Sequence, residues 1–361
     1  MVTISAAMRR ALAGLKPGQV PQDVGAGFNY VVPRGARRTH LVNRDKIGEI
    51  VSRLGYENTY NSSNLDIIDF SPGFGLFSRE LNKLLNPQSH VMLEHVDLYY
   101  NFMKRYVADL DSIKALPVDG YKWIVYNSII KHGAITPRKL GREKIHSELL
   151  FVGNFTSQQG YQLLCQFLNC TAYQSWLQKY GRVRLLAWQH EEEAFKMCTP
   201  EHDPSRTRVA VVTSLFHDVR IIAGRHGTGP ARSYFAPEVE LSQDDFFMPK
   251  PLALVEFTPK QPQAAFENLH GHSLEYVLRS IWVTPKAVMS KVIQSLGPGA
   301  VTDLQDRIGH LYDKRPCDLT NDEIFQVIHA FQDWPFKPNI LFDLGNDDYG
   351  ASKDNLHSLF V

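Results

Sequence analysis

A group of residues at 69–75 has the composition of a nucleotide-binding turn. An apolar run at 65–70 predicts a strand buried on both faces. Asp69 lies near its end, and Ser71, Gly73 and Gly75 follow it. Apolar residues then recur at helical spacing over 76–85. Glycines let the backbone approach a ligand, and a helix N-terminus offers unpaired N–H groups. The spacing differs from the dinucleotide G-x-G-x-x-G pattern, so the turn alone fits a ligand site and a bare strand-to-helix connection equally well.

A second acid stands where such folds hold a ribose. Residues 90–93 predict the next strand, and Glu94 ends it, 25 positions after Asp69. An acidic residue at this place accepts hydrogen bonds from the two ribose hydroxyls. Without further context, Glu94 also fits a capping or solvated acid.

Composition excludes several functional classes. The chain has 361 residues, 43% hydrophobic residues and a net charge of +1, which predicts two domains and no polyanion partner from total charge alone. Four cysteines without a C-x-x-C pattern predict reduced thiols, and the spacing of His190, Cys198 and His202 matches no metal-ligand pattern. The uncharged part of 149–178 is too polar to span a bilayer, so no membrane association is expected.

Charge and element order divide the chain into four parts. Residues 1–27 are basic and predict either a mitochondrial transit segment or a disordered arm. Residues 28–260 alternate strands with helices, which predicts an α/β domain with a mostly parallel sheet and an antiparallel edge. Its later strands are expected at 183–188, 209–214, 219–223 and 252–257. Residues 261–343 predict a small all-α domain, and 344–361 a flexible acidic tail.

The order of these parts resembles the ribosomal RNA adenine N6-dimethyltransferase superfamily and, within it, the mitochondrial transcription factor B family. The resemblance to the enzymes covers about residues 39–257. The resemblance to the factors covers nearly the whole chain and is most specific at 180–188, 316–323 and 334–338. It implies a Rossmann-like S-adenosylmethionine methyltransferase fold with a helical C-terminal domain.

The resemblance also implies a cofactor site. Glu94 falls on the ribose-binding acid and Asp119 on the acid that faces the adenine ring, while Ser71 replaces the usual first glycine of the turn. We interpret this pocket as vestigial, and we expect that the chain does not require a cofactor. The residues implied to contact S-adenosylmethionine are Leu41, Asp69, Ser71, Gly73, Gly75, Glu94, Asp119 and Asn154.

The motif that holds the target base is altered. The enzymes have N-(L/I/P)-P-Y, in which the Asn side chain and a backbone carbonyl hold the target amino group and the Tyr stacks on the flipped adenine. Here the residues are Asn154, Phe155, Thr156 and Ser157. Loss of the stacking ring costs about 1–3 kcal/mol. We therefore expect no catalytic residues and no methyl transfer, unless Phe155 replaces the missing ring.

The resemblance instead implies a mitochondrial matrix factor, monomeric alone, that joins the single-subunit mitochondrial RNA polymerase, confers promoter specificity and helps to melt promoter DNA by binding the single strand. The alternative is an active rRNA adenine N6-dimethyltransferase. Tyr121 and Trp123 are candidate stacking residues, although Trp123 also fits a core position. Candidate phosphate contacts, each of which also fits a solvated charge, are Arg37, Arg38, Arg138, Lys139, Arg142, Lys144, Lys179, Arg182 and Arg184.

Overall fold

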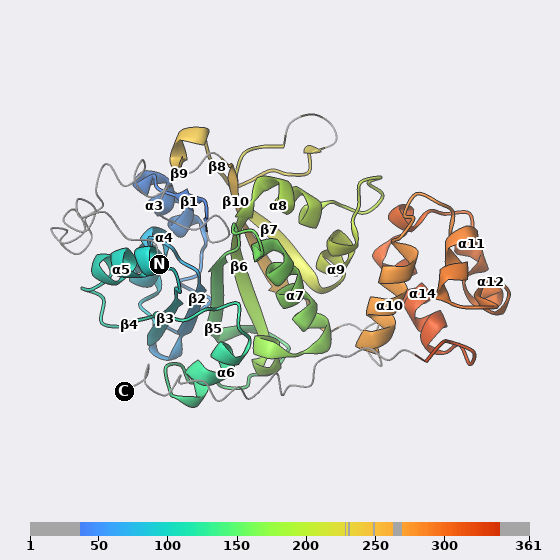
Figure 1. The fold of residues 1–361 in the computed structure, drawn as a ribbon, viewed down its shortest axis with the longest axis horizontal. Coiled ribbons are helices and arrows are strands. Elements are labelled where there is room, and N and C mark those ends of the chain that lie inside the picture. Colours follow the sequence, from blue (N-terminus) through green and yellow to red (C-terminus); the bar gives the residue numbers. More distant parts are fainter. Residues whose placement is uncertain (1–36, 228, 230–231, 248–249, 263–268, 340–361) are drawn as a thin grey trace.

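The computed structural model describes residues 37–227, 229, 232–247, 250–262 and 269–339 (Figure 1). The predicted segments 1–27 and 344–361 lie outside the described residues. Eight strands form one sheet in the order β4-β3-β2-β5-β6-β10-β7-β8. The parallel strands are β2 (Asp66–Phe70), β3 (Ser89–Leu93), β4 (Ile113–Leu116), β5 (Ile145–Asn154) and β6 (Arg182–His190). β10 (Leu252–Pro259) runs antiparallel to β6 and to β7 (His217–Gly224), and β8 (Val239–Glu240) follows at the edge.

Helices cover both faces of the sheet, which explains why strands such as β2 are buried along their whole length. One face packs against α3 (Arg44–Arg53), α4 (Leu76–Leu85) and α5 (Asp97–Tyr106). The other packs against α6 (Ile124–Lys131), α7 (Gly160–Tyr173) and α8 (Glu191–Cys198). The predicted α/β class, with its mostly parallel sheet and late antiparallel strands, is confirmed.

Residues 209–214 correct one expectation, because they belong to helix α9 (Arg208–Phe216) and not to a strand. Their valines suggested β-structure. The side chain of Thr207 caps the helix by accepting a hydrogen bond from the backbone N–H of Ala210. Apolar side chains of α9 then pack into a cluster with the C-terminal helices, and this tertiary packing outweighs the local preference.

The C-terminal helices lie beside α9 at the far end of the molecule from α5 (Figure 1). They are α10 (Gly271–Ile281), α11 (Met289–Val292), α12 (Ala300–Asp303), α13 (Gln305–Ile308) and α14 (Asn321–Gln332). Short 3₁₀ turns complete the chain at Ser62–Asn64, Trp176–Tyr180, Gln243–Asp245, Ile293–Leu296, Gly309–Leu311 and Pro316–Asp318. The domain boundary expected after residue 260 stays a prediction, since α9 shares its core with these helices.

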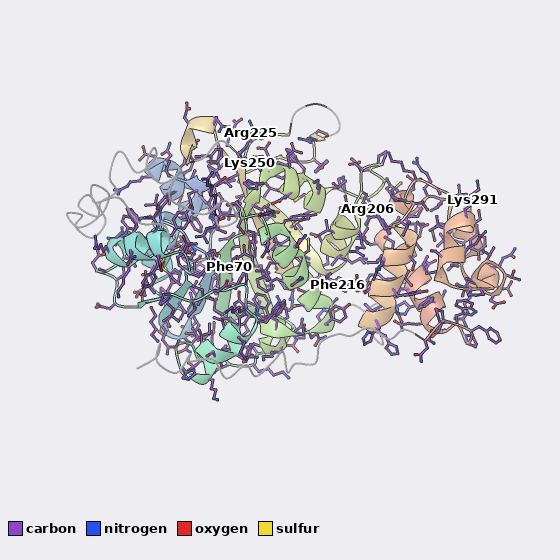
Figure 2. The ribbon with its side chains drawn as sticks, viewed as in Figure 1. Phe70, Arg206, Phe216, Arg225, Lys250 and Lys291 are labelled. Carbon is purple, nitrogen blue, oxygen red and sulfur yellow. The ribbon has the colours of Figure 1, made fainter. Side chains whose placement is uncertain are left out.

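A buried arginine joins the two sides of this contact (Figure 2). Arg206 donates from its guanidinium to the backbone carbonyl of Leu319 and to the side chains of Ser214 and Asn321. It therefore ties the start of α9 to the start of α14.

A buried histidine gives the fold a predicted sensitivity to acid. His217 lies at the start of β7, its Nε2 is 2.8 Å from Thr171 Oγ1, and burial lowers its pKa from 6.5 to about 3. Between these values the unfolded chain binds one more proton, so stability falls as the pH falls, by about 1.4 kcal/mol per pH unit. In urea unfolding between pH 6 and 5, His217→Gln should make the fall of stability with pH shallower by the contribution of one proton.

The matched control is His310→Gln, because His310 is exposed. It removes an imidazole without touching the buried one, and a slope in His217→Gln equal to that of this control would show that burial does not keep His217 neutral.

No helix in the described ranges is long and apolar enough to cross a membrane. Among the same residues, no cluster of His, Cys, Asp and Glu side chains is arranged to hold a metal ion. The four cysteines are free thiols.

Candidate functional site

The glycine turn joins β2 to α4 at the carboxyl edge of the sheet, beside the point where β3 and β5 flank β2 on opposite sides. Open α/β sheets bind ligands at such a point. Ser71, Gly73 and Gly75 have φ values of 53°, 63° and 72°, so all three are left-handed. A serine rarely adopts this conformation, and the buried backbone N–H of Ser71 donates to the carbonyl of Leu93 at 2.9 Å. The turn therefore has left-handed backbone at all three positions despite the serine.

Glu94 lies directly after β3, and its side chain is fully buried. Its two carboxylate oxygens are 2.8 and 2.7 Å from Nη2 of Arg38. The backbone N–H of Val96 donates to Oε1 at 2.9 Å, and that of Gly73 donates to Oε2 at 3.0 Å. The acid at the ribose position is thus bonded by the chain itself.

Arg38 is 2% exposed, which corrects its assignment as a phosphate contact on the surface. Its guanidinium lies 4.6 Å from the ring centre of Tyr99. Burial alone would lower the pKa of Arg38, but the attraction of Glu94 and then Tyr99 raises it, so the side chain stays charged. The following residues, β1 (His40–Leu41), pair antiparallel with β9 (Phe246–Phe247) and fix this segment over the site.

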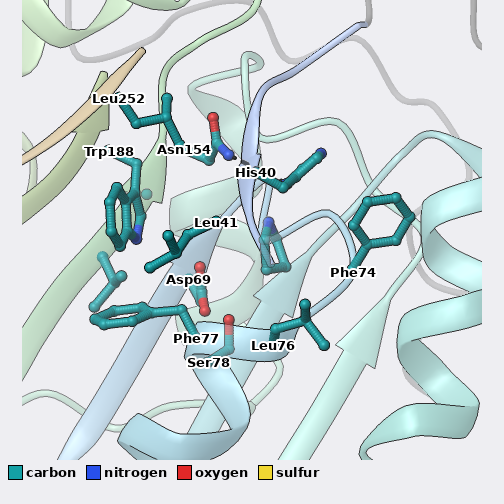
Figure 3. Close-up of a pocket in the computed structure, with 13 residues that line it drawn as sticks. His40, Leu41, Asp69, Phe74, Leu76, Phe77, Ser78, Asn154, Trp188 and Leu252 are labelled. Carbon is teal, nitrogen blue, oxygen red and sulfur yellow. Dashed lines mark hydrogen bonds between the residues drawn. The ribbon is translucent and has the colours of Figure 1, made fainter. Parts of the chain in front are cut away.

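His40 packs against the glycine turn (Figure 3). A Cβ built on Gly73 would lie 2.0 Å from His40 Cε1, so the glycine is required by the imidazole. Its ring also contacts Phe74, at 4.7 Å between centres. Burial, and then the charge of Arg38, keep the pKa of His40 well below its ordinary value. His40 is therefore neutral at physiological pH.

The cavity left beside His40 is small. Its volume is about 30 Å³, and its lining includes Leu41, Asp69, Asn154 and Trp188 (Figure 3). Ligand pockets for drug-sized molecules measure about 300–1,000 Å³. Asp69 lies 3.3 Å from His90 Nε2 through its Oδ2, and Leu41 is part of the core.

The altered base motif is turned inward. Asn154, at the end of β5, donates from Nδ2 to the carbonyl of Thr39 at 3.0 Å and accepts from Thr156 through Oδ1. Phe155 is fully buried and stacks on Phe70 at 5.0 Å between ring centres. It therefore does not present a ring to an extruded base, and the proposed replacement of the missing Tyr by Phe155 is wrong. Ser157 is also buried and is hydrogen-bonded to the hydroxyl of Tyr121.

Tyr121 and Trp123 differ in their surroundings. Tyr121 is half-buried, with its ring edge-on to Phe70 and its backbone N–H donating to Asp119 Oδ1 at 3.0 Å. Asp119 is one-third exposed and lies 3.8 Å from His95 Nδ1. Trp123 packs against Phe167 and Trp176 at 5.3 and 6.1 Å between ring centres. Trp123 therefore contributes to the aromatic core, and Tyr121 is the better candidate for stacking.

The basic candidates at 138–144 and 179–184 lie at the opposite edge of the sheet. Residues 138–144 directly precede β5, and residues 179–184 include the first three residues of β6, so both segments mark the amino ends of two parallel strands. The backbone N–H of Leu140 donates to the carbonyl of Tyr180 at 2.8 Å, which places the segments side by side. Tyr121 and these cations therefore belong to two separate surfaces.

All four arginines at this amino edge have partners within the chain, and the burial of Arg182 corrects its assignment as a phosphate contact. Arg138 pairs with Glu148, and Arg142 donates to the carbonyl of Gln178. Arg182 is buried and donates to a carbonyl, and Arg184 bonds Thr258 beneath two tyrosine rings. Lys139, Lys144 and Lys179 are exposed, with no carboxylate within ion-pair distance among the described residues. Arg37, at the carboxyl edge, is half-buried.

The sequence-based reasoning missed the roles of Arg38, His40 and Tyr99. Arg38 and Glu94 are 56 positions apart, and no local pattern joins them. The one indication in the sequence was Leu41, which was expected to contact the cofactor and which directly follows His40.

Comparisons with known proteins agree with this geometry. The sequence model of the ribosomal RNA adenine dimethylase family matches residues 37–333. "Mitochondrial transcription factor 1" of Lachancea kluyveri is 27% identical over 314 residues, which cover 84% of this chain and 91% of that protein. The protein of the same name from Saccharomyces cerevisiae is 28% identical over 316 residues, with the same coverage. A dimethyladenosine transferase from Plasmodium falciparum shares the fold, with a TM-score of 0.54 at 12% identity over 81% of this chain and 98% of that one.

Proposed function

This chain belongs to the ribosomal RNA adenine dimethylase family, and we propose that it acts in mitochondrial transcription initiation. The observation that carries the proposal is its similarity to the two yeast mitochondrial transcription factors 1, over 84% of this chain and 91% of each relative. The similarity therefore covers most of the length of both proteins and is too long to be confined to the sheet domain.

The site supports a role without methyl transfer. An adenine methyltransferase must stack the flipped base and hold its amino group. Here Phe155 is buried against Phe70, and the Asn154 amide is bonded to Thr39. The residues that would grip an adenine are therefore engaged inside the protein.

The carboxyl edge retains features suited to an unpaired base. Single-stranded nucleic acids are bound by cations that follow the backbone and by aromatic rings that stack on bases. Tyr121 offers a half-buried ring at this edge, with Arg37 and the exposed Lys122 as cations. We assign the melted strand of promoter DNA to this surface. The partner is the single-subunit mitochondrial RNA polymerase, with this chain a monomer in the matrix when alone.

The three exposed lysines at the amino edge predict a salt dependence. β5 has ten residues and spans about 33 Å from the amino edge to the carboxyl edge of the sheet. Because one base pair of duplex DNA rises about 3.4 Å, a duplex that contacts both edges covers about ten base pairs. Each phosphate contact adds about 0.9 to the log–log salt slope. Substituting Lys139, Lys144 and Lys179 together by alanine should lower the slope of promoter binding by ~2.7.

A single Lys291→Ala variant, in the C-terminal helices, serves as the control and should leave this slope unchanged. An unaltered slope in the triple variant would show that duplex DNA does not reach the amino edge.

The test of the proposed function is a pair of assays on one preparation. The first measures run-off transcription by the mitochondrial RNA polymerase from a duplex promoter, with and without this protein. The second measures methyl transfer from labelled S-adenosylmethionine to ribosomal RNA, because membership in the dimethylase family favours that alternative. Stimulated transcription without methylation supports the proposal, and methylation without stimulation refutes it.

A further inference from the structure

We propose that Arg38 and His40 occupy the place that S-adenosylmethionine, the cofactor implied by the family, would need, so that the chain closes this site with its own side chains. The inference concerns the pocket and does not depend on the role in transcription. A chain that binds no cofactor here could still fail as an initiation factor, and the two failures are measured separately.

Glu94 has no acceptor capacity left for a ribose. A carboxylate offers about four lone-pair positions. The four contacts to Glu94 come from Nη2 of Arg38, which bonds both oxygens, and from the backbone N–H groups of Gly73 and Val96. A ribose diol would have to displace the charged guanidinium, whose hydrogen bonds to the carboxylate are stronger than those of a neutral hydroxyl.

The space above the glycine turn is also filled. Glycines in such turns allow a ligand to approach the backbone. Here the His40 ring makes that approach in place of a ligand. Its Cε1 lies so close to the Gly73 backbone that a Cβ on residue 73 would clash with it. The cavity that remains beside it, about 30 Å³, has room for no more than a few water molecules.

The closing segment is anchored on both sides. Thr39 accepts from Asn154 Nδ2 at 3.0 Å through its carbonyl, and its backbone N–H donates to Thr156 Oγ1 at 2.9 Å. Beyond it, β1 pairs with β9. Thr156 replaces the proline of the enzymes' motif, so the same substitution that alters the base site also supplies an acceptor that holds the closing segment. Hydrogen bonds of Asn154 and Thr156 with Thr39 therefore connect the altered base motif to the segment that closes the cofactor site.

The experiment is a calorimetric titration of the full chain with S-adenosylhomocysteine, repeated as a thermal shift. The variants are the wild type, Arg38→Ala/His40→Ala, and Arg79→Ala. Arg79 is a matched control, because it is another buried arginine with a carboxylate partner, Asp109, but it lies on α4 outside this pocket. Circular dichroism establishes that each variant is folded.

We expect the wild type and Arg79→Ala to show no saturable binding up to ~1 mM ligand, and the double variant to bind with a Kd below about 0.1 mM, at least about tenfold tighter than that limit. Saturable binding by the wild type would overturn the proposal, whether or not the double variant folds. A folded double variant that binds no better than the wild type would overturn it as well.

Discussion

Replacing Arg38 with methionine should lower the free energy of unfolding by about 3–5 kcal/mol, because it leaves a buried carboxylate without its charged partner. Glu94 is fully buried, and water cannot replace the guanidinium without opening the segment at residues 37–41. Total stability of a domain is about 5–15 kcal/mol, so the variant should fold but unfold at clearly lower urea concentration. Equilibrium urea unfolding measures the loss.

The matched variant Arg38→Met/Glu94→Gln removes both charges, but its single amide oxygen can accept from only one of the two N–H groups of Gly73 and Val96, which bond different oxygens of Glu94. It should recover part of the lost stability, since the larger part of the cost arises from the uncompensated charge. A loss below about 1 kcal/mol in the single variant would contradict the buried pair, because that is the range of exposed ion pairs.

Tyr121→Ala should reduce promoter opening about 5- to 140-fold, because stacking of an unpaired base on an aromatic ring contributes about 1–3 kcal/mol. The Tyr121 ring is half-buried at the carboxyl edge, next to Asp119. Fluorescence of a 2-aminopurine placed in the melted region reports the opening of a duplex promoter by polymerase with each variant.

Tyr121→Phe is the matched control, because it keeps the ring and loses only the hydroxyl contact to Ser157. It should open the promoter nearly as well as the wild type. Trp123→Ala should instead lower the melting temperature, since Trp123 packs on Phe167 and Trp176. Equal opening by Tyr121→Ala and the wild type would remove Tyr121 from the DNA contact.

The sheet and the turn were predictable because their causes are local. The apolar run at 65–70 and the glycines at 73 and 75 specify a buried strand followed by a turn and a helix. Helix α9 was not predictable, because its valines favour a strand and only packing against the C-terminal helices makes it helical.

The interior of the site could be predicted only in part. The position of Glu94 and the altered residues at 154–157 are visible in the sequence. The partner of Glu94 is not, because Arg38 stands in a basic run where a surface charge is the ordinary expectation. The same difficulty applies to the buried Arg182 and the half-buried Arg184, whose hydrogen-bond partners lie on a strand that is distant in sequence.

The most direct test of the central claim is run-off transcription from the same promoter in two forms, linear duplex and pre-melted around the start site. If the protein acts by helping to melt promoter DNA, it should stimulate the polymerase strongly on the duplex, and the pre-melted template should need it far less. Equal stimulation of both templates, or none on the duplex, would contradict this account.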